Sequence, residues 1–148
     1  MRNINLPTYP KALIEAGRFT KEEGRVFVAM PFNATHSEIL WRVIKEACDD
    51  NQMHVRRGDM PLLPNSIIAD VVEEIETAEI IIADLTGLNA NVMYELGMAH
   101  ARCQAVILLC RRGQTLPFDL ASIRCIFYDV GAEDGSLTAG ACLELKST

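Results

Sequence analysis

Apolar and polar residues follow one another along the chain in blocks that predict five strands separated by helices. Short apolar runs predict strands at 25–30, 53–56, 79–84, 105–110 and 124–128. Between them, apolar residues recur with helical spacing at 36–49, at 66–77 and from about 91 to 103. Residues 1–24 are expected to form an arm or a short helix, and 136–145 another short helix.

The order of these elements indicates the fold class. Ile80, Ile81 and Ile82 follow one another, which is typical of a central parallel strand that is buried on both faces. Helices of about a dozen residues between strands predict crossovers and helices on both faces of the sheet. We therefore expect a flavodoxin-like (Rossmann-like), doubly wound α/β domain over residues 25–148, with five parallel strands in the order 2-1-3-4-5. Its site should lie beyond the carboxyl ends of strands 1 and 3.

Composition restricts the classes of partner. The 148 residues are 49% hydrophobic and 23% charged, which suits one globular domain. A net charge of −6 argues against a nucleic-acid polymer as partner, and the sequence lacks the long apolar run of a membrane helix. Five cysteines without C-x-x-C spacing give no metal site and favour a reducing cytoplasm. Neither G-x-G-x-x-G nor a P-loop occurs, so no cofactor is expected.

Two loops should meet at the expected site, residues 31–37 and 84–94. Asp84 ends a buried strand, so its carboxylate should project at the rim of the sheet. Asn91 and Glu95 are four residues apart and share one helix face, whereas Tyr94 should point to a different face. Considered alone, Glu95 reads as a solvated helical residue and Asp84 as the cap of a turn.

Four motifs together add a resemblance to a known family. They read VFVAMPF at 26–32, RGD at 57–59, IIIADLTG at 80–87 and NANVMYELG at 89–97. With these motifs, residues 25–128 resemble the nucleoside 2-deoxyribosyltransferase-like superfamily. That superfamily includes N-glycosidases of deoxynucleoside monophosphates and is similar to TIR-type domains that cleave NAD.

The resemblance implies a chemistry for the candidate residues. Glu95 matches the glutamate that attacks the anomeric carbon and releases the base, and Asp84 or Asp70 would assist it. The ligand would be a nucleoside, nucleotide or dinucleotide, and the protein would be a homodimer or a higher homo-oligomer. Residues expected to bind the substrate are Met30, Pro31, Phe32, Asn33, Arg57, Asp59, Gly87, Asn89 and Asn91.

Two departures from the family pattern keep other functions open. Asn89 stands where transferases of the family often carry an aspartate, and an amide cannot donate an acidic proton. The first loop has Phe32 in a region where a tyrosine often steadies the glutamate. These departures favour an alternative, a module that binds or senses a nucleotide without turning it over. A third candidate is a structural partner domain that assembles through residues 1–24.

Overall fold

A computed structural model describes residues 19–32, 35–58 and 67–130. The expected helix at 136–145, most of the arm, Asn33 and Asp59 lie outside the described residues. The sheet consists of β1 (Arg25–Ala29), β2 (His54–Arg57), β3 (Ile80–Asp84), β4 (Val106–Arg111) and β5 (Cys125–Tyr128). Its order is β2-β1-β3-β4-β5 and all neighbouring strands are parallel. The expected fold class is confirmed.

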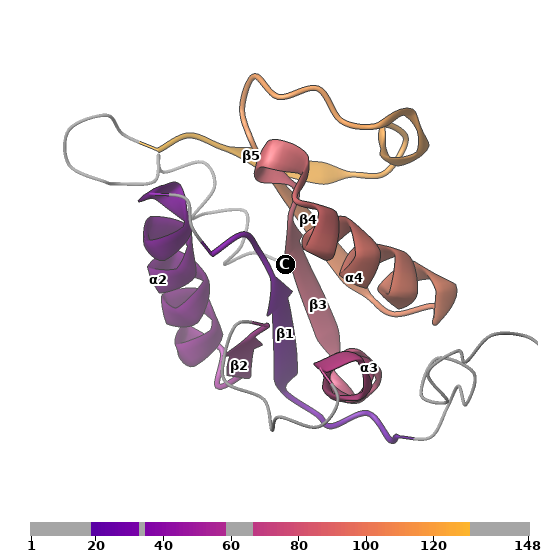
Figure 1. Ribbon diagram of the computed structural model, residues 1–148. Coiled ribbons are helices and arrows are strands. Elements are labelled where there is room, and N and C mark those ends of the chain that lie inside the picture. The colour runs from indigo at the N-terminus through magenta and orange to yellow at the C-terminus, as the bar shows by residue number, and fades with distance from the viewer. Residues whose placement is uncertain (1–18, 33–34, 59–66, 131–148) are drawn as a thin grey trace, which may run out of the picture.

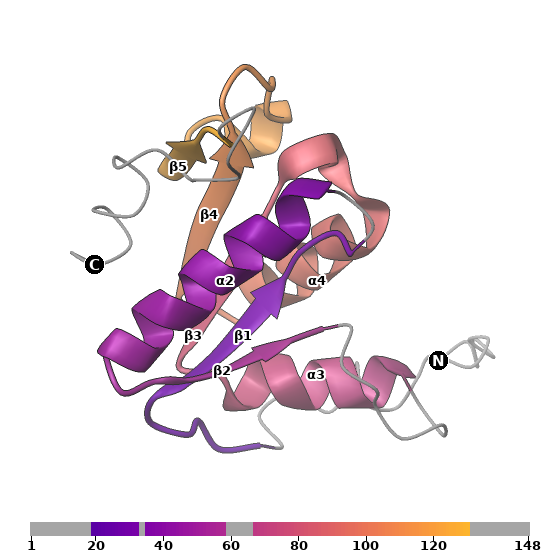
Figure 2. The same ribbon diagram turned by 90° about the vertical axis from the view of Figure 1, so that its left-hand side faces the viewer.

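Helices cover both faces of the sheet. α2 (Thr35–Asp50) lies on one face, and α3 (Ile67–Thr77) and α4 (Ala90–Ala101) lie on the other (Figure 1). Seen from the side of α2, that helix crosses in front of the sheet (Figure 2). The short turns η1 (Thr86–Leu88) and η2 (Phe118–Leu120) were not expected, because three residues are too few to show a hydrophobic period. Among the described helices, none combines the length and the apolarity needed to cross a bilayer.

Alternation along the strands divides the core into two clusters. Phe27 and Ile81 belong to the cluster on the face of α3 and α4, together with Val92 and Leu96 of α4. Ile82 and Tyr128 belong to the cluster on the face of α2. Since strand side chains alternate between faces, the residue two places after Ile82 also faces α2. This residue is Asp84.

Residues 19–24, the described end of the arm, are attached beside the amino end of the sheet. The Glu22 amide donates to the Thr77 carbonyl at 2.8 Å, and the Gly24 amide donates to Oε2 of Glu79 at 2.5 Å. Next to them, the buried Glu74 carboxylate binds Arg25 at 2.9 Å and Arg56 at 2.8 Å. These contacts lie away from the carboxyl ends of the strands, where the site is expected.

Candidate functional site

Glu95 lines a cavity between α3 and α4, beyond the carboxyl ends of β1 and β2. The cavity measures about 340 Å³, which is at the lower end of the range for small-molecule sites. Its walls come from the residue stretches that follow β1 and β2 and from the two helices. The lining residues are Phe32, Gly58, Ile68, Val71, Asn91, Tyr94, Glu95 and Met98.

The local sequence explains why α4 presents Glu95 to this cavity. Asn89 caps the helix, and its side-chain oxygen accepts from the amides of Asn91 at 3.0 Å and Val92 at 3.3 Å. Val92 and Leu96 are buried against the sheet, which turns the adjacent face of the helix toward α3. Asn91 and Glu95 both line the cavity, so their expected common face is confirmed.

The environment of Glu95 changes its acidity. Burial raises the pKa of its carboxyl group to about 7. Gly58 lies beside this group: a Cβ there would be 3.7 Å from Oε1 of Glu95, an ordinary contact, and 3.3 Å from Cζ of Phe27, which is the tighter one. A carboxyl group with a pKa near neutrality is present in both protonation states at pH 7. It can therefore act as a nucleophile or as a general acid or base.

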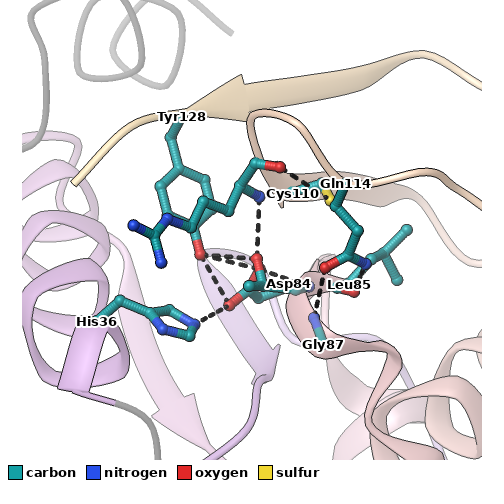
Figure 3. A network of polar contacts seen from close by, with 9 residues as sticks. His36, Asp84, Leu85, Gly87, Cys110, Gln114 and Tyr128 are labelled. Carbon is teal, nitrogen blue, oxygen red and sulfur yellow. Dashed lines mark hydrogen bonds and ion pairs between the residues drawn. The ribbon is translucent and has the colours of Figure 1, made fainter.

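Asp84 lies on the other face of the sheet, in a separate polar network (Figure 3). Its side chain is fully buried, and Oδ1 accepts from the Thr86 amide at 3.1 Å and the Thr86 hydroxyl at 2.6 Å. The Tyr128 hydroxyl lies 3.1 Å from both carboxylate oxygens, and Nε2 of His36 lies 3.7 Å from Oδ2. Burial raises the pKa of Asp84, and these hydrogen bonds oppose that effect. Asp84 thus joins β3, β5 and α2 and does not line the cavity of Glu95.

The turn between β3 and α4 is held by Gln114. Its Oε1 accepts from the Gly87 amide at 2.6 Å, and its Nε2 donates to the Leu85 carbonyl at 2.8 Å (Figure 3). Gly87 has a φ of +74°, a conformation that favours glycine. Gly87, expected to bind substrate, is therefore placed as a turn residue outside the cavity lining. Gln114 carries no sequence signal for this role, because it lies 27 positions away in the chain.

Two other candidates lie near the cavity without lining it. Asp70 is in the first turn of α3, close in sequence to the lining residues Ile68 and Val71. Its Oδ2 atom is buried and has no hydrogen-bond partner among the described residues. Pro31 is half-buried and precedes the lining residue Phe32.

Two further candidates belong to the face of α2. Arg57 binds Glu38 of α2 at 2.8 Å, and its guanidinium lies 5.1 Å from the ring centre of Trp41. Met30 is buried in the core cluster under α2. Neither residue lines the cavity that contains Glu95.

The cavity also contains residues that sequence reasoning missed. Tyr94, expected on a different face from Glu95, lines the cavity beside it and is 52% exposed. Gly58 is part of the RGD motif, but its position beside Phe27 and Glu95 is visible only in the fold. Within the described ranges, no three His, Cys, Asp or Glu side chains are grouped so that they could hold a metal ion.

Comparisons with known proteins bear on the fold. No family model and no curated protein matches the sequence. Two mutants of a flavo di-iron protein from Thermotoga maritima match the structure with a TM-score of 0.56, at 9% and 10% sequence identity. Each match covers 86% of this chain but only 34% or 35% of the other, so the chain spans about a third of those proteins. Together with the strand order, this likeness shows that the chain has a flavodoxin-like α/β fold.

Proposed function

We propose that the protein cleaves the N-glycosidic bond of a nucleoside or nucleotide, with Glu95 as the nucleophile. The observation that carries this proposal is a carboxyl group with a pKa of about 7 in a largely apolar cavity. Phe32 and Tyr94 in the same lining offer aromatic faces on which a base can stack. The resemblance of the motif around Glu95 to N-glycosidases supports the same assignment.

The reaction would proceed in two steps through a covalent intermediate. In the first step, an ionised oxygen of Glu95 forms a bond to C1′ of the sugar. The bond from C1′ to the base nitrogen breaks, and the base leaves with that electron pair and takes a proton from water. In the second step, water attacks C1′ and gives up a proton, and the free carboxylate returns. A second base as acceptor, in place of water, would make the enzyme a transferase.

Asn91 and Asp70 are the proposed assisting groups. The Asn91 amide lies one helical turn before Glu95 and can donate to or accept from sugar hydroxyls. Asp70 is preferred to Asp84 as the assisting carboxyl group, because Asp84 faces α2 on the far side of the sheet. Asp70→Asn should lower the rate of base release, and an unchanged rate would remove Asp70 from this role.

A second candidate function is a module that binds a nucleotide and does not cleave it. The structure gives one observation in its favour: the Asn89 side chain caps α4, so it is engaged in the helix.

For either function, we propose that the protein is located in the cytoplasm and forms a homodimer or a higher homo-oligomer. The four described cysteines are free thiols, which suits a reducing compartment. Sedimentation of the full chain tests the oligomeric state.

Product analysis tests the proposal. Purified protein is incubated with a panel of ribonucleosides, deoxynucleosides, their monophosphates and NAD, and released base is measured by chromatography. We expect base from at least one of them, and a loss of at least about 100-fold in Glu95→Gln. Glu46→Gln, an exposed glutamate on α2, is the matched control and should keep full activity. A bound ligand that remains intact would instead favour the binding module.

A further inference from the structure

We propose that Gln114 is a positioning residue: by holding the turn η1 it fixes where α4 begins, and so determines how Asn91 and Glu95 are presented to the cavity. The inference rests on the proposed function, to which it adds one residue, and its first test does not require activity. Gln114 comes from the loop between β4 and η2 and does not line the cavity itself. Its side chain extends to the turn between β3 and α4 (Figure 3).

The backbone of the turn η1 is strained and depends on contacts from outside. Gly87 and Leu88 are both left-handed, with φ of +74° and +48°, and a leucine rarely adopts such a conformation. Strained conformations of this kind persist where the surrounding structure determines them. Gln114 supplies two such contacts. Its Oε1 accepts from the Gly87 amide at 2.6 Å, and its Nε2 donates to the Leu85 carbonyl at 2.8 Å.

Consecutive hydrogen bonds connect this turn to the start of α4. The Leu88 amide donates to the Leu85 carbonyl at 3.0 Å, and the same oxygen accepts from Gln114. Asn89 follows directly and caps α4, with its side-chain oxygen 3.0 Å from the amide nitrogen of Asn91. Loss of the contacts made by Gln114 is therefore expected to loosen the helix first at Asn91, the first lining residue of α4.

Such loosening should be measurable at Glu95, which lies one helical turn after Asn91. Burial raises the pKa of Glu95 to about 7 from its ordinary value of 4.5. If the start of α4 moves away from the cavity wall, water reaches the carboxyl group and the effect of burial decreases. The titration of Glu95 thus reports how well the turn positions α4. A residue that contributed only to stability would leave this titration unchanged.

NMR titration of the Glu95 carboxyl carbon tests the inference, and the signal is identified by its absence from Glu95→Gln. Gln114→Met keeps the length of the side chain but removes the amide that makes both hydrogen bonds. We expect the midpoint to fall from about 7 by at least about 0.5 pH unit. Thr115→Val, at an exposed residue of the same loop, is the control and should leave it unchanged. An unchanged midpoint in Gln114→Met would overturn the inference.

A second variant changes the same turn through its backbone. Gly87→Ala adds a methyl group that would meet nothing within 4 Å, but it penalises the φ of +74°. It should lower the Glu95 midpoint as Gln114→Met does. Gly24→Ala is the matched control, because Gly24 has a φ of +76° and lies beside the amino end of the sheet. It should lower stability and leave the midpoint unchanged. An equal fall in both glycine variants would contradict the inference.

Kinetics at pH 8 connect the inference to the proposed function. Glu95 is largely ionised at this pH in the parent and in Gln114→Met, so a difference in rate reflects its position. With a nucleoside that the parent cleaves, Gln114→Met should lower kcat/KM about 10-fold. An unchanged kcat/KM would overturn the positioning role and leave the proposed function intact. If the parent releases no base from any substrate, the proposed function fails, and the titration of Glu95 decides the role of Gln114 by itself.

Discussion

Asp84 and Glu95 lie on opposite faces of the sheet, although only the turn η1 and the first half of α4 separate them in the chain. Asp84 faces α2 and binds Tyr128 and Thr86, whereas Glu95 lines the cavity beside α3. This separation assigns different roles to two carboxyl groups that the sequence places in one site. Asp84 holds strand ends together, and Glu95 is the group available to a ligand.

The role of Asp84 can be tested through Tyr128. Tyr128→Phe removes a hydroxyl that lies 3.1 Å from both oxygens of the buried Asp84 carboxylate. Loss of this partner should lower the free energy of unfolding by about 1–3 kcal/mol, measured by urea denaturation. Tyr94→Phe, at a residue that is 52% exposed, should change it by less than about 0.5 kcal/mol. Equal stability of Tyr128→Phe and the parent would show that the network contributes nothing.

The pKa of Glu95 predicts a pH dependence of activity. A nucleophilic carboxylate must be ionised, so kcat/KM should rise with pH and level off above a midpoint of about 7. Asn91→Asp adds a second negative charge one turn away, which should raise the pKa of Glu95 and move the midpoint upward. A profile that falls between pH 5 and 8 would mean that the protonated form is the active one.

The same pKa predicts a pH dependence of stability. The unfolded chain releases the Glu95 proton near pH 4.5, while the folded chain keeps it up to about pH 7. Between these values the folded state binds more protons, so the contribution of Glu95 to stability falls as the pH rises. Glu95→Gln removes this penalty and should stabilise the protein at pH 8 by about 1–3 kcal/mol, but not at pH 4. Thermal unfolding of both proteins at the two pH values measures the difference, and a gain that is the same at both would contradict it.

Phe32 is predicted to bind the base. It lines the cavity and is 40% exposed, so Phe32→Ala should cost little stability. Base stacking on an aromatic side chain contributes about 1–3 kcal/mol, so we expect at least about 5-fold weaker ligand binding in calorimetry. Phe118→Ala, at a residue that is 92% exposed and outside the lining, serves as the control. Unchanged affinity in Phe32→Ala would place the base elsewhere.

Hydrophobic spacing was sufficient to predict the five strands and the three described helices, because burial on one or both faces determines which elements form. The sheet order followed from the alternation of these strands and helices, which fits the flavodoxin-like fold class. The three isoleucines at 80–82 mark the central strand for this reason. The shared face of Asn91 and Glu95 was equally accessible from their spacing. The contact between Asp84 and Tyr128 was not recognised, because Tyr128 comes from a strand 44 positions away. Contacts of this kind depend on how strands assemble, which local sequence does not encode.

Capture of the covalent intermediate tests the central claim most directly. A nucleoside whose sugar carries fluorine at C2′ should slow the second step and leave the sugar attached to the enzyme. Intact-protein mass spectrometry, followed by peptide mapping, should then find one added sugar on Glu95, and none in Glu95→Gln. Release of base without any adduct, or an adduct on another residue, would contradict the assignment of Glu95 as the nucleophile.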